Sequence, residues 1–140
     1  MPTEANVTYR TNICFEAQSE SGHTVMIDGP PEAGGENAGF RPMELLLLGM
    51  GGCMAMDILL ILRRMRKEVR SYRVQIQAER AEDMPRVYTE VKMEHLFQGV
   101  DLNTAAIERA IHLAAETYCS GVAMFAKTAK ITNTFRILES

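Results

Sequence analysis

With 140 residues and 46% hydrophobic side chains, the chain has the length of one common domain and enough apolar surface for a core. Its 24% charged residues and net charge of −3 exclude a disordered chain and supply no basic field for a nucleic-acid partner. The three cysteines, Cys14, Cys53 and Cys119, are too scattered for a secreted disulfide framework. Because no CxxC or HxxxH spacing is present, we predict no metal and no cofactor.

The N-terminal region, residues 1–40, is predicted to hold strands and a loop. Residues 1–10 lack a basic and then apolar leader, so we expect a cytoplasmic protein. Residues 7–17 and 24–28 are rich in β-branched and aromatic side chains, which predicts two strands joined as a hairpin through residues 19–22. Residues 29–40 contain four glycines and two prolines, which favour a loop.

A long apolar helix is predicted over residues 42–69. Pro42 suits a helix start, and Glu44 lies in the first turn, where a negative charge is favourable. Residues 45–62 read LLLLGMGGCMAMDILLIL, which raises a membrane span as an alternative. Asp57 inside this segment would cost about 2.5 to 3.5 kcal/mol in a bilayer. We therefore expect no membrane partner and a helix buried inside the protein or between two subunits.

Residues 71–140 are predicted to follow the order ββααβ. Apolar side chains alternate in residues 72–81 and 86–97, which predicts two antiparallel strands. Asn103 is a good N-cap for a helix that ends near residues 119–121. A short helix over residues 122–127 and a strand over 131–138 complete a single α+β domain of residues 1–140.

Two cysteines occupy positions where a thiol can be reactive. Cys53 follows two glycines within the long helix, and Cys119 stands at the junction of two predicted helices. Unpaired amides at a helix start stabilise a thiolate, the nucleophilic form of cysteine. The alternative is that each is a small buried hydrophobic residue. Because an isolated buried carboxylate is costly, Asp57 is expected to cap a backbone group, to face a wet cavity or to pair with a cation, and pairing is the favoured alternative.

Two segments together carry a family resemblance: residues 41–53 (RPMELLLLGMGGC), and residues 118–120 (YCS) preceded by AIERAIHLAAET. The resemblance extends to the stretch between these two segments, at residues 79–82 (ERAE) and 85–88 (PRVY). With these motifs the chain resembles the OsmC/Ohr family of osmotically inducible and organic hydroperoxide resistance proteins. The resemblance implies an α+β fold of antiparallel sheets with a long central apolar helix. It also implies an intertwined homodimer whose two active sites lie at the interface.

For this chain the resemblance implies a thiol-dependent peroxidase that reduces organic hydroperoxides in oxidative-stress defence. Cys53 would attack the peroxide and become a sulfenic acid, and Cys119 would resolve it as a disulfide. A dithiol reductant, lipoyl-type in the Ohr branch, would restore both thiols. By position, Arg41 would hold the thiolate and Glu44 would help to orient it.

The sequence departs from the family pattern beside the motif proline. The peroxidase members have glutamate directly after the proline, where this chain has Met43, and Glu44 comes one residue later. One residue rotates a helical side chain by about 100°. An alternative is therefore a non-catalytic dimer that binds a small apolar or thiol ligand in the interface pocket. A third is a structural interaction protein that needs neither cysteine.

Overall fold

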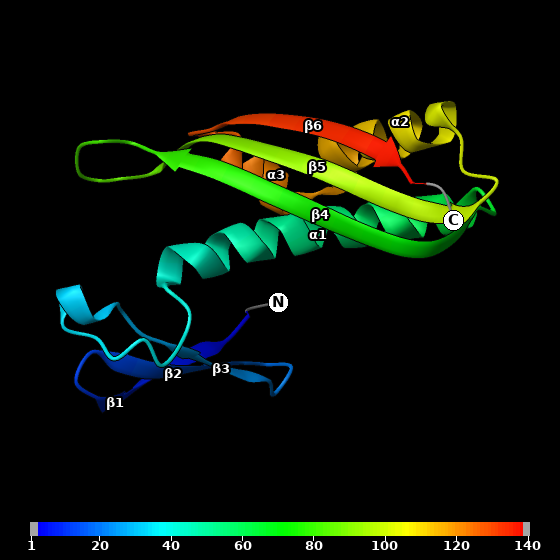
Figure 1. Ribbon diagram of the computed structural model, residues 1–140. Coiled ribbons are helices and arrows are strands. Elements are labelled where there is room, and N and C mark those ends of the chain that lie inside the picture. Colours follow the sequence, from blue (N-terminus) through cyan, green and yellow to red (C-terminus); the bar gives the residue numbers. More distant parts are fainter. Residues whose placement is uncertain (1–2, 139–140) are drawn as a thin grey trace. The chain divides into compact units, whose positions relative to one another are not determined.

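A computed structural model describes residues 3–138, which form two compact units divided within the long helix, between Leu48 and Gly49. The first unit holds three strands, a short 3-10 turn and the start of the helix. The second holds the rest of that helix, three strands and the remaining helical segments (Figure 1). The elements are β1 (Ala5–Thr11), β2 (Cys14–Ser19), β3 (Thr24–Ile27), η1 (Pro31–Ala33), α1 (Pro42–Arg64), β4 (Glu68–Arg80), β5 (Tyr88–Val100), α2 (Thr104–Leu113), η2 (Ala114–Tyr118), α3 (Ser120–Phe125) and β6 (Lys130–Ile137).

The first unit is built on an antiparallel sheet in the order β1-β2-β3. The turn over residues 19–22 lies where the sequence predicts it, and the Gly22 N–H donates to Ser19 O at 2.9 Å. The single strand predicted over residues 7–17 is wrong, because the chain reverses between β1 and β2. Asn12 takes a positive φ of 58° there, a conformation that asparagine tolerates better than most residues.

The glycine- and proline-rich loop of residues 29–40 is organised by the buried Asp28 carboxylate. It accepts hydrogen bonds from three backbone N–H groups, those of Gly29, Glu36 and Ala38, at 2.8 to 3.1 Å. The bond from Ala38 is the main cause that lowers the pKa of Asp28, and it acts against the effect of desolvation. One carboxylate therefore fixes the path of the loop that leads into α1.

Helix α1 runs without a break through its glycines but is shorter than predicted. It ends at Arg64, and Arg66 takes a positive φ of 61° that turns the chain into β4. Val69, the last residue of the predicted helix, pairs with Gly99 in the sheet. The error arises because an apolar run shows no helix end by itself.

By length and hydropathy alone, α1 is long and apolar enough to cross a membrane. Only 33% of its most apolar window is buried within the chain. The buried side chains recur every three or four residues along one face: Met50, Met54, Ile58, Ile61 and Leu62. This face lies in the core of the second unit.

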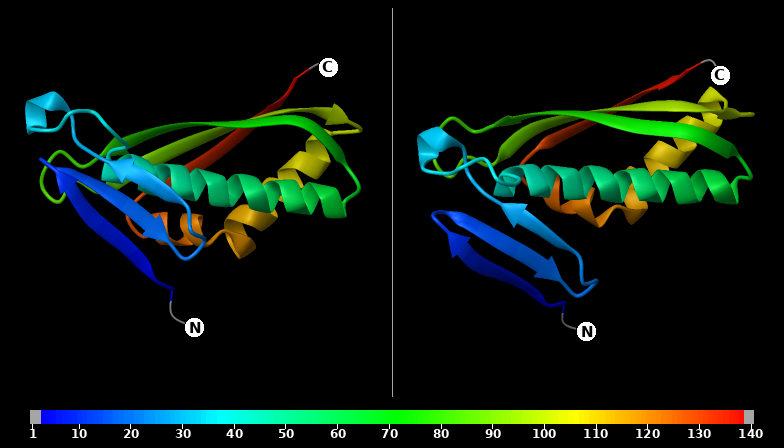
Figure 2. Two further views of the ribbon diagram at one scale, coloured as in Figure 1. Left: turned by 90° about the horizontal axis from the view of Figure 1, so that it is seen from below. Right: turned by 60° about the horizontal axis from the view of Figure 1, so that its bottom comes forward.

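The second unit has one sheet, in the order β4-β5-β6, with helices along one face (Figures 1 and 2). Strands β4 and β5 are antiparallel, as the alternation predicts. Strand β6 pairs with β5 in parallel, which differs from the expectation of antiparallel sheets. The connection through α2, η2 and α3 is long enough for the crossover that a parallel pair requires.

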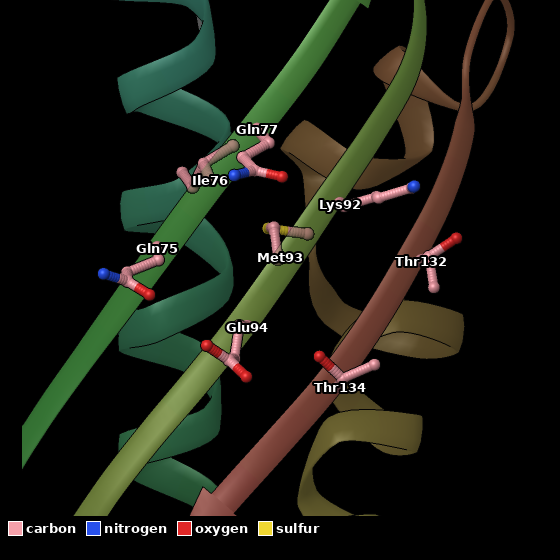
Figure 3. A pocket seen from close by; sticks show the side chains of 8 residues that line it. All are labelled: Gln75, Ile76, Gln77, Lys92, Met93, Glu94, Thr132 and Thr134. Carbon is pink, nitrogen blue, oxygen red and sulfur yellow. The ribbon is translucent and has the colours of Figure 1, made fainter.

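The two faces of this sheet differ in polarity. Figure 3 shows a hollow on its surface where side chains of β4, β5 and β6 gather, and the polar ones are Gln75, Gln77, Lys92, Glu94, Thr132 and Thr134. Alternate residues such as Val91, Met93 and Phe97 are buried. The apolar face thus packs against the helices that carry the candidate site.

Candidate functional site

Two cysteines and one carboxylate meet in the second unit. Cys53 and Asp57 come from α1, and Cys119 comes from the end of η2. The ligand atoms of the three side chains all lie within 4.8 Å of one another. The structure therefore brings together the two cysteines singled out in the sequence, although more than sixty residues separate them.

Close packing at two glycines holds these elements near each other. A Cβ on Gly51 would overlap the side chain of Ile76 on β4, so glycine allows α1 to approach the sheet. A Cβ on Gly121 would lie 3.0 Å from the Met50 Cα, so the start of α3 also lies against α1. Each glycine is two residues from a cysteine of the site, so the close packing helps to bring the two thiols together.

A π-helical turn places Cys119. The Cys119 N–H donates to Ala114 O at 2.8 Å, five residues back, and the backbone of Cys119 then leaves the helix in an extended conformation. The sequence predicts a helix continuing to residues 119–121, so it misses this widened turn. Such turns are frequent at functional sites.

The Cys119 thiol is buried and tends to keep its proton. Desolvation is the main cause that raises its pKa to about 11, although the Val122 N–H donates to its sulfur at 3.3 Å and acts in the opposite direction. A hydrogen bond and charge interaction with Cys53 raise the pKa further. The Cys119 thiol is therefore protonated at neutral pH.

Cys53 is half-buried and has a carboxylate as its neighbour. Its thiol donates to Asp57 Oδ2 over 3.9 Å, a pairing allowed because residues i and i+4 share one helix face. Within residues 3–138 no lysine, arginine or histidine forms an ion pair with Asp57, which differs from the expected cation partner. The carboxylate is half-exposed, so water reduces the cost of its charge.

Arg41 and Glu44 lie in the first unit, at the start of α1. The Arg41 guanidinium donates to Asn37 Oδ1 at 3.0 Å and to Gly39 O at 3.2 Å. The Arg41 N–H donates to Glu44 Oε1 at 2.8 Å, so Glu44 caps the helix start. Both expected site residues thus have structural contacts there.

A partly buried polar chain, centred on the buried His95, crosses the same sheet. The Tyr72 hydroxyl lies 2.7 Å from His95 Nδ1, and His95 Nε2 lies 2.8 Å from Asn133 Oδ1. Desolvation lowers the pKa of His95 and raises the pKa of Tyr72, so both are neutral. Tyr72 then donates to Nδ1, and Nε2–H donates to Asn133. The alternation of β5 could have placed His95 on the inner face, but not its partners.

Comparison with known proteins gives a consistent family pattern. A sequence profile described as OsmC-like protein matches residues 34–134. Protein YhfA of Escherichia coli (strain K12) is 36% identical, covering 98% of this chain and 99% of its own.

Solved structures show the same fold. A hypothetical protein from Aquifex aeolicus VF5 has a TM-score of 0.87 at 26% identity, covering 100% of this chain and 98% of that one. An organic hydroperoxide resistance protein, OsmC, from Legionella pneumophila has a TM-score of 0.69 at 15% identity, with 96% of each chain covered.

Proposed function

Because the chain belongs to the OsmC-like family, we propose that it is a thiol-dependent peroxidase that reduces organic hydroperoxides with two cysteines. The observation that carries this proposal is the convergence of the Cys53 and Cys119 sulfurs, which lie within 4.8 Å of each other. A thiol pair at this distance needs only a small movement to form a disulfide. The structural likeness to organic hydroperoxide resistance proteins supports the same activity.

The two thiols take different roles because their surroundings differ. Cys53 is half-buried and therefore within reach of a peroxide, whereas Cys119 is 3% exposed and protonated at neutral pH. Cys53 is the attacking sulfur, and Cys119 is the resolving thiol. Asp57, which accepts the Cys53 thiol proton in a hydrogen bond, positions the nucleophile.

The reaction divides into two balanced steps. The Cys53 sulfur attacks one peroxide oxygen, the O–O bond breaks, and the thiol proton leaves with the alkoxide as an alcohol. The product is a sulfenic acid on Cys53. The Cys119 sulfur then displaces its hydroxyl, which leaves as water, and a disulfide forms. An external dithiol reduces this disulfide by exchange and is itself oxidised.

A second copy of the chain completes the proposed enzyme. Exposed residues recur every three or four positions along one face of α1: Gly49, Gly52, Met56 and Leu60. The side chain of Met56 is 67% exposed and that of Leu60 is 49% exposed. An apolar stripe of this kind is typical of a helix that packs on a partner. Light scattering is expected to give the mass of a dimer, and Met56→Glu should shift it towards the monomer. A monomer for the unaltered chain would contradict this assignment.

The experiment measures consumption of an alkyl hydroperoxide by purified protein with a lipoyl-type dithiol as reductant. Turnover should fall to the free-thiol background in Cys53→Ser. In Cys119→Ser, which cannot form the disulfide, the first turnover should remain and the sulfenic acid should accumulate. Cys14→Ser is the matched control, because Cys14 is a buried thiol of β2 outside the cluster, and it should keep full turnover.

Absence of turnover in a folded protein would overturn the peroxidase and favour a dimer that binds a small apolar or thiol ligand. The observation that favours this ligand-binding alternative is that Arg41 and Glu44 form hydrogen bonds with the loop and the helix start. Turnover can also be absent because the chosen dithiol does not reduce the protein. Measuring the first turnover alone, without dithiol, distinguishes this case from a lack of peroxidase chemistry. One equivalent of alcohol per chain without added dithiol supports the chemistry of the two cysteines.

A further inference from the structure

The cluster of Cys53, Asp57 and Cys119 has the donor atoms of a metal site. It offers two sulfurs and one carboxylate, and these atoms all lie within 4.8 Å of one another. Thiolate sulfur is the ligand that most favours zinc-class ions, and carboxylate oxygen also binds zinc. The spacing in the sequence, without a CxxC or HxxxH pattern, gives no sign of this set.

The distances suit one small ion. Zinc binds sulfur at about 2.3 Å and carboxylate oxygen at about 2.1 Å, so neighbouring donors in a tetrahedral site lie about 3.5 to 3.8 Å apart. The Cys53 sulfur and Asp57 Oδ2 are already 3.9 Å apart. The other pairs need to close by about 1 Å at most. Rotation of the side chains about their Cα–Cβ bonds can supply such a movement.

The surroundings favour metal binding in two ways. Asp57 has no ion-pair partner among residues 3–138, so its charge is available to a cation. The Val122 N–H already donates to the Cys119 sulfur at 3.3 Å, and such outer hydrogen bonds orient metal ligands. Cys53 and Asp57 are half-exposed, which leaves a path for an ion from solvent.

We propose that the reduced protein binds one zinc-class divalent ion through Cys53, Asp57 and Cys119, with water as the fourth ligand. Binding releases the two thiol protons as the sulfurs become thiolates. Three protein ligands and a water form an open site rather than a closed structural one.

The expected effect of the ion on turnover rests on the proposed peroxidase. The ion and the disulfide exclude each other, because each uses both sulfurs. A hydroperoxide that reached the metal-bound form would take two electrons from the two thiolates and two protons from solvent. The products would be the disulfide, an alcohol, water and the released ion. Zinc is therefore expected to inhibit turnover, and oxidation is expected to expel it.

The test uses reduced full-length protein without oxygen or peroxide, titrated with Co²⁺ alone. One Co²⁺ per chain should give the d–d bands of a tetrahedral site and a thiolate-to-cobalt charge-transfer band with the intensity of two thiolates. Zn²⁺ should then displace it. Asp57→Asn keeps the size of the side chain and removes its charge, and should weaken Co²⁺ binding at least about tenfold.

Cysteine variants complete the test. Cys53→Ser and Cys119→Ser should each lose about half of the charge-transfer intensity, whereas Cys14→Ser should leave it unchanged. If a cysteine variant does not fold, the band intensity of the unaltered protein still counts the thiolates. Absence of the band in reduced protein, or unchanged affinity in Asp57→Asn, would overturn the three-ligand site. Since no peroxide is present, this result is independent of whether the protein is a peroxidase.

Discussion

Oxidation of the reduced protein is expected to raise its stability by a measurable amount. A disulfide between Cys53 and Cys119 would join residues 66 positions apart in the chain. The loop-closure relation gives a loss of unfolded-state entropy worth about 4 kcal/mol at 25 °C for a loop of this length. The sulfurs must approach from within 4.8 Å to about 2.05 Å, which strains the folded state and reduces the gain.

We therefore expect the disulfide to add about 2 to 4 kcal/mol to the free energy of unfolding. With a urea dependence of roughly 1 to 3 kcal/mol per molar, the urea midpoint should rise by roughly 0.7 to 4 M. The assay compares urea unfolding of the dithiol-reduced protein with protein treated with one equivalent of hydroperoxide. Mass spectrometry should show the loss of two hydrogens per chain in the treated sample.

The variants separate this effect from general oxidation. Cys119→Ser cannot form the disulfide and should show no rise in midpoint, whereas Cys14→Ser should show the full rise. A disulfide-bonded protein with an unchanged or lower midpoint would refute the reasoning, because it would mean that the folded state must distort substantially to join the two sulfurs. Absence of any bond between the two cysteines would refute the resolving role of Cys119.

Three further predictions concern the second unit. Tyr72→Phe leaves the buried His95 Nδ1 without its hydrogen-bond donor. The free energy of unfolding, measured by urea unfolding, should therefore fall by about 1 to 3 kcal/mol, and an unchanged urea midpoint would contradict this. Because the pKa of His95 is lowered by folding, stability should fall as the pH drops below about 6.5, by up to about 1.4 kcal/mol per pH unit. His112→Gln, which alters an exposed histidine, should keep this slope, and a rise in stability on acidification would disprove it. Asn103→Ala removes the helix cap, whose side-chain oxygen accepts a hydrogen bond from the Ala106 N–H at 2.9 Å. The variant should lose about 1 kcal/mol of stability and unfold at a lower temperature, and equal thermal midpoints would argue against the cap.

The parts of the fold that the sequence predicts are those set by local patterns. The alternation in β4 and β5 and the cap at Asn103 depend on neighbouring residues, so they are readable without the structure. The end of α1 depends on the positive φ of Arg66, and the reversal before β2 depends on that of Asn12. Neither residue is a glycine, and Asn12 lies within a run of strand-forming residues, so neither turn was predicted.

The sequence predicts the two thiols of the site, whereas the hydrogen bond between Cys53 and Asp57 was not predicted. The family motifs single out Cys53 and Cys119, and the structure places them together. The carboxylate expected from the same motifs was Glu44, beside the proline that starts the helix. In the structure Glu44 accepts the Arg41 N–H, a contact that an acidic residue at that position of a helix start tends to make, and its role toward the thiols stays a prediction. A contact of this kind depends only on residues next to one another in the chain, so it is readable from the sequence around Pro42.

Asp57 is the carboxylate that lies beside the Cys53 sulfur, and it can influence both the thiol chemistry and the metal binding of the site. It is one helical turn beyond Cys53, so the two side chains share a face whatever the rest of the fold does. A carboxylate that forms no ion pair among residues 3–138 can accept a hydrogen bond from a thiol, and it can also bind a metal ion together with two thiolates. Those two uses compete for the same oxygen. Peroxide turnover measured across a series of free Zn²⁺ concentrations should therefore fall as the metal site fills, with a midpoint equal to the Zn²⁺ dissociation constant obtained from the displacement of Co²⁺ after correction for the Co²⁺ present. If the two midpoints differ by more than about tenfold, corresponding to about 1.4 kcal/mol, the ion and the reaction do not share this cluster.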